Sequence, residues 1–171
     1  MLVTLGGSDP QNVTATVLTA LKYLSRRDLE ICVVVGASNP HLEGLRAMAR
    51  MMGCTARIEH NVSQMAGLMA WADLAVCAGG STSWELALLG LPTCILVLAE
   101  NQRAIAERLS GEDIADYAGW YDTVTPEGLA QRIDMLLHDA ERRRRMSIRA
   151  QRLVDGYGAA RVVAHMHGVE S

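Results

Sequence analysis

Short apolar runs of β-type residues alternate along the whole chain with segments in which apolar residues recur at helical spacing. The run from Ile31 to Val35 is apolar without alternation, which is typical of a parallel strand covered on both faces. The runs predict strands over Leu2–Leu5, Glu30–Val35, Ala56–Glu59, Leu74–Cys77, Thr93–Leu98 and Asp116–Trp120.

The helical periodicities fall between and after these runs. They predict helices over Pro10–Ser25, His41–Met52, Ser63–Trp71, Ser83–Leu89, Gln102–Leu109, Pro126–His138, Ala140–Val154 and Ala159–His167. Strands and helices that alternate with short turns predict an α/β fold with a doubly wound, Rossmann-like parallel sheet. No linker, repeat or low-complexity segment interrupts the pattern, so the sequence predicts a single domain over residues 1–171.

Residues that start or stop helices support these boundaries. Asp9 is predicted to be the N-cap of the first helix, with Pro10 at the first helical position. Ser63 is predicted to cap the third helix. Gly90, with Pro92 beyond it, is predicted to end the helix that starts near residue 83.

The charge of the chain narrows the classes of partner. The formal net charge is −3 at pH 7 without a broad basic excess, so we expect no nucleic-acid partner. The dense basic run Arg142–Arg145 lies in a helical pattern and is interpreted as a solvated helix face rather than a phosphate or lipid patch. No apolar run approaches the roughly twenty residues of a membrane span.

The cysteines and histidines show no spacing that indicates a metal site or a catalytic group. The four cysteines are Cys32, Cys54, Cys77 and Cys94, and three of them lie inside apolar strand-like runs. They form no Cys-x-x-Cys and pair with no histidine at ligand spacing. We therefore expect reduced, buried thiols in a cytoplasmic protein, without disulfides and without a bound metal.

The glycine turn Gly6–Asp9 ends the first strand and opens the first helix. It matches neither the Gly-x-Gly-x-x-Gly dinucleotide motif nor the Walker loop. One interpretation is a plain turn with an aspartate cap. The other is that its small residues let a ligand approach the backbone. Because Asp9 would repel a phosphate, a sugar or a neutral group is the better neighbour.

The turn Gly79–Thr82, between the fourth strand and its helix, is the better phosphate candidate, although it can also be a plain turn. No carboxylate stands near it before Glu85, and several N–H groups at a helix start can point at one anion. Glu85 has two interpretations: it forms a capping box with Thr82, or its carboxylate binds two ribose hydroxyls. Trp84 is expected to serve packing.

Polar residues also follow the fifth strand at its carboxyl end, in the run Glu100–Gln102. In one interpretation Asn101 is the N-cap of the next helix. In the other, the run contributes to a ligand site, because it lies on the same edge of the sheet as the two glycine turns.

Four motifs stand in a fixed order along the chain: Gly6-Gly7-Ser8-Asp9-Pro10-x-Asn12, Gly79-Gly80-Ser81-Thr82-x-Trp84-Glu85, Leu98-Ala99-Glu100-Asn101-Gln102, and Asp155-Gly156-x-Gly158-Ala159 with Arg161. Together they resemble the carboxyl-terminal half of a GT-B-type enzyme. They are most similar to the UDP-sugar hydrolase family of pseudaminic acid biosynthesis. The layout is also similar to that of the UDP-N-acetylglucosamine transferase family that makes peptidoglycan lipid precursor.

The resemblance implies two Rossmann-like halves with the active site between them, this half holding the uridine diphosphate without metal or cofactor. Glu85 would bind the ribose hydroxyls, the backbone around Ile58 the uracil, and the turn Gly80–Thr82 the diphosphate. Gly7–Ser8 and Asn101–Gln102 would lie towards the phosphates and the sugar. The implied binding residues are Gly7, Ser8, Ile58, Gly80, Ser81, Thr82, Glu85, Asn101 and Gln102.

In the resembled hydrolase family, the histidine that activates water belongs to the amino-terminal half, and no residue of this chain corresponds to it. We therefore expect no catalytic residue here, and a preceding domain or separate chain that supplies the catalytic half. Among possible proton acceptors on the rim, only Glu100 has no other assigned role.

The function predicted from the sequence is the UDP-sugar-binding domain of a UDP-sugar hydrolase, in which water attacks the anomeric carbon and UDP leaves. The alternative is the donor-binding domain of a GT-B glycosyltransferase, in which an acceptor hydroxyl replaces the water. A second alternative is a non-catalytic subunit that binds a nucleotide-sugar.

Overall fold

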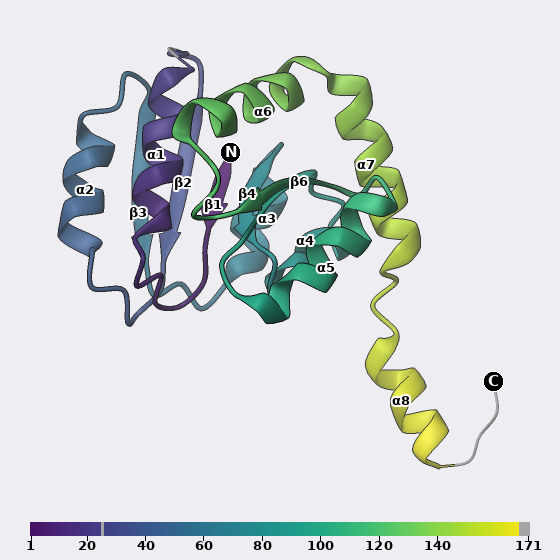
Figure 1. Cartoon of the computed structure of the whole chain (residues 1–171). Coiled ribbons are helices and arrows are strands. Elements are labelled where there is room, and N and C mark those ends of the chain that lie inside the picture. The colour runs from purple at the N-terminus through teal and green to yellow at the C-terminus, as the bar shows by residue number, and fades with distance from the viewer. Residues whose placement is uncertain (25, 168–171) are drawn as a thin grey trace.

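The computed structural model describes residues 1–24 and 26–167. Its strands form a six-stranded parallel sheet in the order β3-β2-β1-β4-β5-β6 (Figure 1). Strand order runs outward from β1 to β3 and then returns to β4 on the other side of β1. This reversal defines the doubly wound fold that the sequence predicts. The strands are β1 (Leu2–Thr4), β2 (Glu30–Val35), β3 (Thr55–His60), β4 (Ala75–Ala78), β5 (Thr93–Val97) and β6 (Ala115–Trp120).

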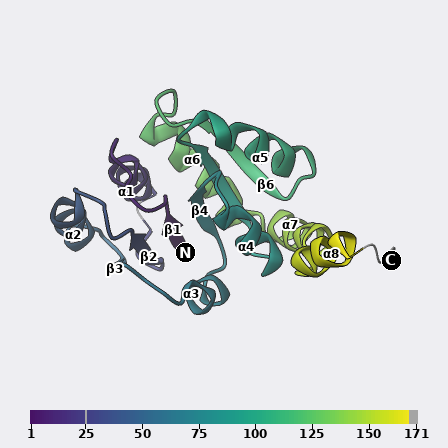
Figure 2. The ribbon, with the colours of Figure 1, turned by 90° about the horizontal axis from the view of Figure 1, so that it is seen from below.

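Helices cover both faces of the sheet (Figure 2). Helices α1, α2 and α6 contribute buried side chains to the cluster on one face, and α3, α4 and α5 to the cluster on the other. The helices are α1 (Val13–Tyr23), α2 (Leu42–Arg50), α3 (Met65–Trp71), α4 (Thr82–Leu88), α5 (Glu100–Gly111), α6 (Pro126–His138), α7 (Ala140–Leu153) and α8 (Gly158–Met166).

The inner strands are buried on both sides, which explains their uninterrupted apolar sequence. Successive residues point to opposite faces, so Leu2 and Cys77 pack in one cluster and Val3 and Val76 in the other. Every residue of β4 and β5 is buried. This core fixes the carboxyl ends of the strands, from which the loops of the candidate site start.

The last two helices behave differently from each other. Helix α7 packs against the body through Met146 and Ala150, one in each cluster. Helix α8 has no buried residue and stands away from the rest of the molecule (Figure 1).

The basic run Arg142–Arg145 is only partly a solvated face, which corrects the sequence interpretation. Arg142 and Arg132 both donate to the carboxylate of Asp116, whose side chain is only 9% exposed, over 2.7 and 3.1 Å. Arg143 donates to backbone oxygens at the end of α6. Two of the four arginines therefore tie α7 to its neighbours.

Six of the eight predicted helix starts are wrong, by one to three residues. Helix α1 begins at Val13 rather than Pro10, because Asp9 and Asn12 adopt left-handed φ angles of 40° and 55° and form a separate turn. The predicted end of this helix, Ser25, lies outside the described residues. Helix α3 begins at Met65 without a side-chain cap, so Ser63 is not its N-cap. The glycine stop is confirmed, with φ 68° at Gly90.

The predicted burial of the cysteines is confirmed for three of the four, while Cys54 is half-buried, and no cysteine forms a disulfide. Burial raises the pKa of Cys77 to about 12, against a smaller opposing effect of its contact with Ser83. Among the described residues, no cluster of potential ligands could hold a metal ion. Within the same part of the chain, no helix is long and apolar enough to span a bilayer.

Candidate functional site

The candidate site lies where strand order reverses, between β1 and β4. In a doubly wound sheet, the loops that leave two such neighbouring strands run to opposite faces and open a crevice at their carboxyl ends. Gly6 and Gly7 follow β1, Gly79 and Gly80 follow β4, and the polar run that starts at Glu100 follows β5, the next strand. The topology therefore brings three of the predicted motifs to one edge of the sheet.

The loop after β1 exposes its small residues. Gly7 and Ser8 are exposed, and no heavy atom lies within 4 Å of the position that a Cβ on Gly7 would occupy. Three residues of this loop, Gly6, Asp9 and Asn12, have positive φ angles. The loop is therefore tightly bent, with open space beside its glycine.

Asp9 is not the N-cap of α1, a position that Asn12 takes, but its buried carboxylate still caps the amino end of the helix from four residues before it. Its carboxylate accepts the N–H groups of Val13 and Thr14, both at 2.8 Å, and the hydroxyl of Thr14 at 2.6 Å. The amino end of α1 is therefore already neutralised by a carboxylate. A second anion is disfavoured there, which leaves the start of α4 as the better place for phosphate.

The turn after β4 carries three consecutive N–H groups, those of Gly80, Ser81 and Thr82. None of these donates to a protein acceptor among the described residues. Ser83 stabilises the turn, because its buried hydroxyl donates to the backbone oxygen of Ala78 over 3.1 Å. Successive unpaired N–H groups at a helix start are a typical anion-binding arrangement.

Glu85 lies one turn into α4 and is exposed. The capping box is not formed, because Thr82 is the first helical residue and Ser81 takes the N-cap position with helical φ and ψ. Within residues 1–24 and 26–167, no hydrogen bond to the Glu85 carboxylate is found. The capping interpretation is therefore wrong, and the carboxylate is available to a ligand.

The run after β5 belongs to α5 itself, since the helix begins at Glu100. Asn101 is its second residue and exposed, and the N-cap position falls on Ala99, so the predicted cap is wrong. Gln102 folds back, and its side-chain oxygen accepts the N–H of Leu98 over 2.9 Å. Gln102 thus stabilises the segment between β5 and α5, while Asn101 faces solvent.

Two further contacts define this part of the rim. A Cβ on Gly79 would lie 3.0 Å from the backbone oxygen of Gln102, so the turn after β4 packs directly on α5. Glu100, to which the sequence analysis assigns no other role, pairs with Arg103 through two contacts of 3.0 and 3.1 Å. The only rim carboxylate that had no assigned role is therefore engaged with a guanidinium.

Ile58 is not brought together with the other predicted residues. It lies within β3, paired with Val33 of β2, and its side chain packs against the core. Because β2 separates β3 from β1, Ile58 lies about 10 Å from β1 at the usual strand spacing. Its proposed role towards uracil remains a prediction.

Two supporting residues escaped the sequence interpretation. Ser83 was placed only at a helix start, whereas it is a buried hydroxyl that holds the turn after β4. Gly36 directly follows β2, as Gly79 directly follows β4 and Gly6 lies two residues after β1, and this recurrence of glycine after strands was the signal that could have found it.

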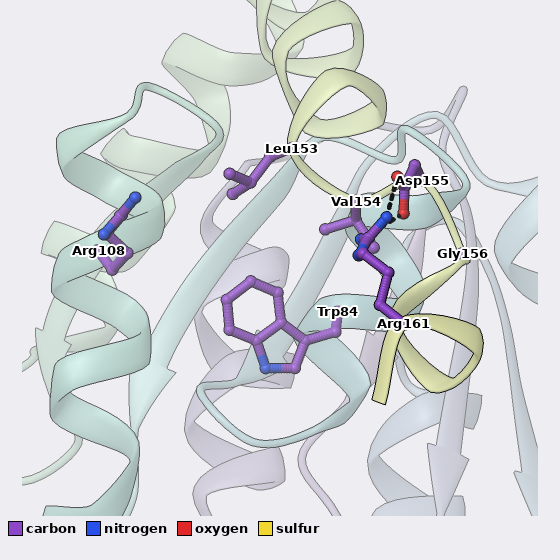
Figure 3. Close-up of a pocket in the computed structure, with 8 residues that line it drawn as sticks. Trp84, Arg108, Leu153, Val154, Asp155, Gly156 and Arg161 are labelled. Atoms are coloured by element: carbon purple, nitrogen blue, oxygen red, sulfur yellow. Dashed lines mark hydrogen bonds and ion pairs between the residues drawn. The ribbon is translucent and has the colours of Figure 1, made fainter. Parts of the chain in front are cut away.

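A cavity of about 370 Å³ lies away from the candidate site, between α4, α5, α7 and the start of α8 (Figure 3). Trp84, expected to serve packing, is 36% exposed and lines this cavity. Arg161 pairs with Asp155 and holds the pKa of that carboxyl at about 2, and Arg108 pairs with Glu112. Since each of these arginines already has a carboxylate partner, this cavity is a weaker candidate for binding an anion than the turn after β4, whose N–H groups are unpaired.

Residues 1–160 match the glycosyltransferase family 28 C-terminal domain. The chain belongs to this family. It is 32% identical over 165 residues to the spore coat polysaccharide biosynthesis protein SpsG of Bacillus subtilis (strain 168), a match that covers 96% of this chain and 48% of that protein.

A second relative carries the name of a transferase. The chain is 33% identical over 171 residues to the UDP-N-acetylglucosamine--N-acetylmuramyl-(pentapeptide) pyrophosphoryl-undecaprenol N-acetylglucosamine transferase of Xanthomonas oryzae pv. oryzae (strain MAFF 311018), covering 94% of this chain and 37% of the transferase. The chain therefore spans about half of the spore coat protein and just over a third of the transferase.

Among solved structures, the crystal structure of Acinetobacter baumannii MurG superposes with a TM-score of 0.82 at 20% identity, covering 98% of this chain and 49% of that one. WaaG, a glycosyltransferase involved in lipopolysaccharide biosynthesis, gives a TM-score of 0.68 at 20% identity, covering 91% and 42%. The predicted fold, the carboxyl-terminal half of a GT-B-type fold, is confirmed. The specific assignment to the hydrolase of pseudaminic acid biosynthesis gains no support, and these comparisons favour the transferase alternative.

Proposed function

We propose that this chain is the domain that binds the nucleotide-sugar donor of a GT-B glycosyltransferase, with the uridine diphosphate in the crevice between β1 and β4. The observation that carries the proposal is the row of three unpaired N–H groups at Gly80, Ser81 and Thr82, followed one turn later by the unpaired carboxylate of Glu85. The first suits a diphosphate and the second a pair of ribose hydroxyls.

The same geometry suits the chemistry of glycosyl transfer. As the bond between the anomeric carbon and the diphosphate breaks, negative charge grows on the departing phosphate oxygens. Fixed N–H groups at the start of α4 would stabilise that charge without reorganising. Asp9 contributes indirectly, because its carboxylate occupies the start of α1 and leaves the start of α4 as the favoured anion site.

The acceptor site and the catalytic base belong, in this proposal, to a second Rossmann-like half or a partner chain. A general base must lie within hydrogen-bond reach of the hydroxyl it activates. Each carboxylate on the rim already has another role. Asp9 accepts hydrogen bonds from the start of α1, Glu85 is assigned to ribose, and Glu100 is paired with Arg103. This chain alone should therefore bind the donor and release no UDP from it.

Activity measurements with the second half supplied distinguish transferase from hydrolase. We expect UDP release from a UDP-sugar to require an added acceptor. Steady release of free sugar without acceptor would instead favour the hydrolase, and the absence of turnover with any added half would favour a non-catalytic binding subunit. Steady UDP release by the 171-residue chain alone, abolished by Glu100→Gln, would contradict the assignment of the base to another half.

Binding measurements test the donor site itself. UDP should raise the melting temperature, and the gain in unfolding free energy should approach about 2.7 kcal/mol at a hundred times the Kd. UMP should stabilise less at equal concentration, because it lacks the second phosphate. Equal stabilisation by ATP and UDP would contradict the uridine assignment.

A further inference from the structure

The end of β2 touches the loop after β1 backbone to backbone. Gly36 directly follows β2 and is half-buried. A Cβ on Gly36 would overlap the oxygen, the Cα and the carbonyl carbon of Gly7. The overlap is with main chain, which cannot rotate away as a flexible side chain can. Any residue larger than glycine must therefore push the two segments apart.

A second contact joins the same two loops further along. The Nε2 atom of His41 lies 3.1 Å from the backbone oxygen of Pro10. Because a carbonyl oxygen only accepts, Nε2 carries the proton and donates it. Between the two contacts, the buried Asn39 donates its N–H to the oxygen of Gly36 over 3.2 Å and accepts the N–H of His41 over 2.7 Å. Residues 36–41 thus form one braced turn.

The loop after β1 has unfavourable features in its own geometry. Asp9 and Asn12 hold left-handed φ angles of 40° and 55°, a region that residues other than glycine adopt less readily. The buried Oδ1 atom of Asn12 has no hydrogen-bond partner among the described residues. Gly7 and Ser8, at the tip, are exposed.

We propose that the turn 36–41 positions Gly7 and Ser8 for the donor, with Gly36 and His41 as positioning residues that never touch the ligand. This inference rests on the proposed function, since it assumes that Gly7 and Ser8 lie towards the phosphates and the sugar. The inference adds that donor affinity depends on the turn after β2, although the residues that face the donor follow β1 and β4.

The test compares the affinity for UDP and for UMP in the 171-residue chain by titration calorimetry. Gly36→Ala should raise the Kd for UDP about tenfold, the size of one lost hydrogen bond to a charged group. The Kd for UMP, which lacks the second phosphate, should change by less than about threefold. Gly53→Ala is the matched control, because a Cβ on Gly53 meets no atom within 4 Å.

His41→Ala provides a second variant if Gly36→Ala does not fold, since His41 is only half-buried and its removal adds no atom to a packed contact. We expect it to raise the Kd for UDP about threefold, and His41→Gln, which retains a side-chain N–H donor, to restore most of the affinity. Unchanged UDP affinity in folded Gly36→Ala or in His41→Ala would overturn the inference. So would equal losses for UDP and UMP. If the unmodified chain binds no UDP, the proposed function itself fails.

Discussion

Replacing Glu85 by glutamine separates the binding role of this residue from any structural role. The substitution keeps the size of the side chain and removes its charge. The carboxylate makes no hydrogen bond within the described residues, so none is lost. What remains is its favourable interaction with the start of α4, worth about 0.3–1 kcal/mol. We therefore expect Glu85→Gln to lower the free energy of unfolding by less than about 1 kcal/mol.

The expected effect on UDP is larger. Hydrogen bonds to a charged acceptor contribute about 1.5–3 kcal/mol, against about 1 kcal/mol for neutral pairs. The difference, about 1.5 kcal/mol, corresponds to a roughly tenfold weaker Kd. Titration calorimetry with UDP, together with urea denaturation of the same samples, measures both quantities.

Glu141→Gln is the matched control, because Glu141 is likewise exposed and lies in the first turn of a helix. It should show a comparable small change in stability and no change in UDP affinity. A Kd for UDP that is unchanged in Glu85→Gln would refute the binding role of this carboxylate. If the free energy of unfolding also fell by several kcal/mol, the role of Glu85 would be structural instead.

Three further predictions concern the scaffold. Gly90→Ala should destabilise the chain by more than about 1 kcal/mol in urea, since φ is 68° and the new Cβ would meet α7 side chains at 2.8–2.9 Å; wild-type stability would contradict this. At pH 8, iodoacetamide should modify half-buried Cys54 before Cys77, whose pKa is about 12, as mass spectrometry can show. Arg142→Gln should cost about 1 kcal/mol, because it removes a 2.7 Å contact to a buried aspartate. Exposed Arg144→Gln should change stability by less than about 0.5 kcal/mol, and equal losses would contradict the pairing.

The fold was readable from the sequence because its signals are local. An uninterrupted apolar run such as Ile31–Val35 indicates a strand and also indicates that both faces of that strand are covered. Gly90 likewise indicates a helix end, because it adopts a left-handed backbone conformation that other residues avoid. These signals, repeated along the chain, are enough to specify alternating strands and helices.

The details of the site were less readable because they depend on backbone geometry and distant partners. Thr82 and Glu85 have the spacing of a capping box, but Ser81 takes helical φ and ψ, so the helix starts too early for the box to form. The partner of Arg142 lies 26 residues away, and only the folded sheet brings the two together. The contact of Gly36 with Gly7 is of the same kind.

The central claim is that UDP binds at the turn after β4, and mapping of backbone amide shifts by NMR during a UDP titration tests it most directly. We expect the largest shifts on Gly80, Ser81 and Thr82, with further shifts at Gly7 and Ser8. Shifts confined to the cavity lined by Trp84 and Arg161, or no saturable shift at all, would contradict it.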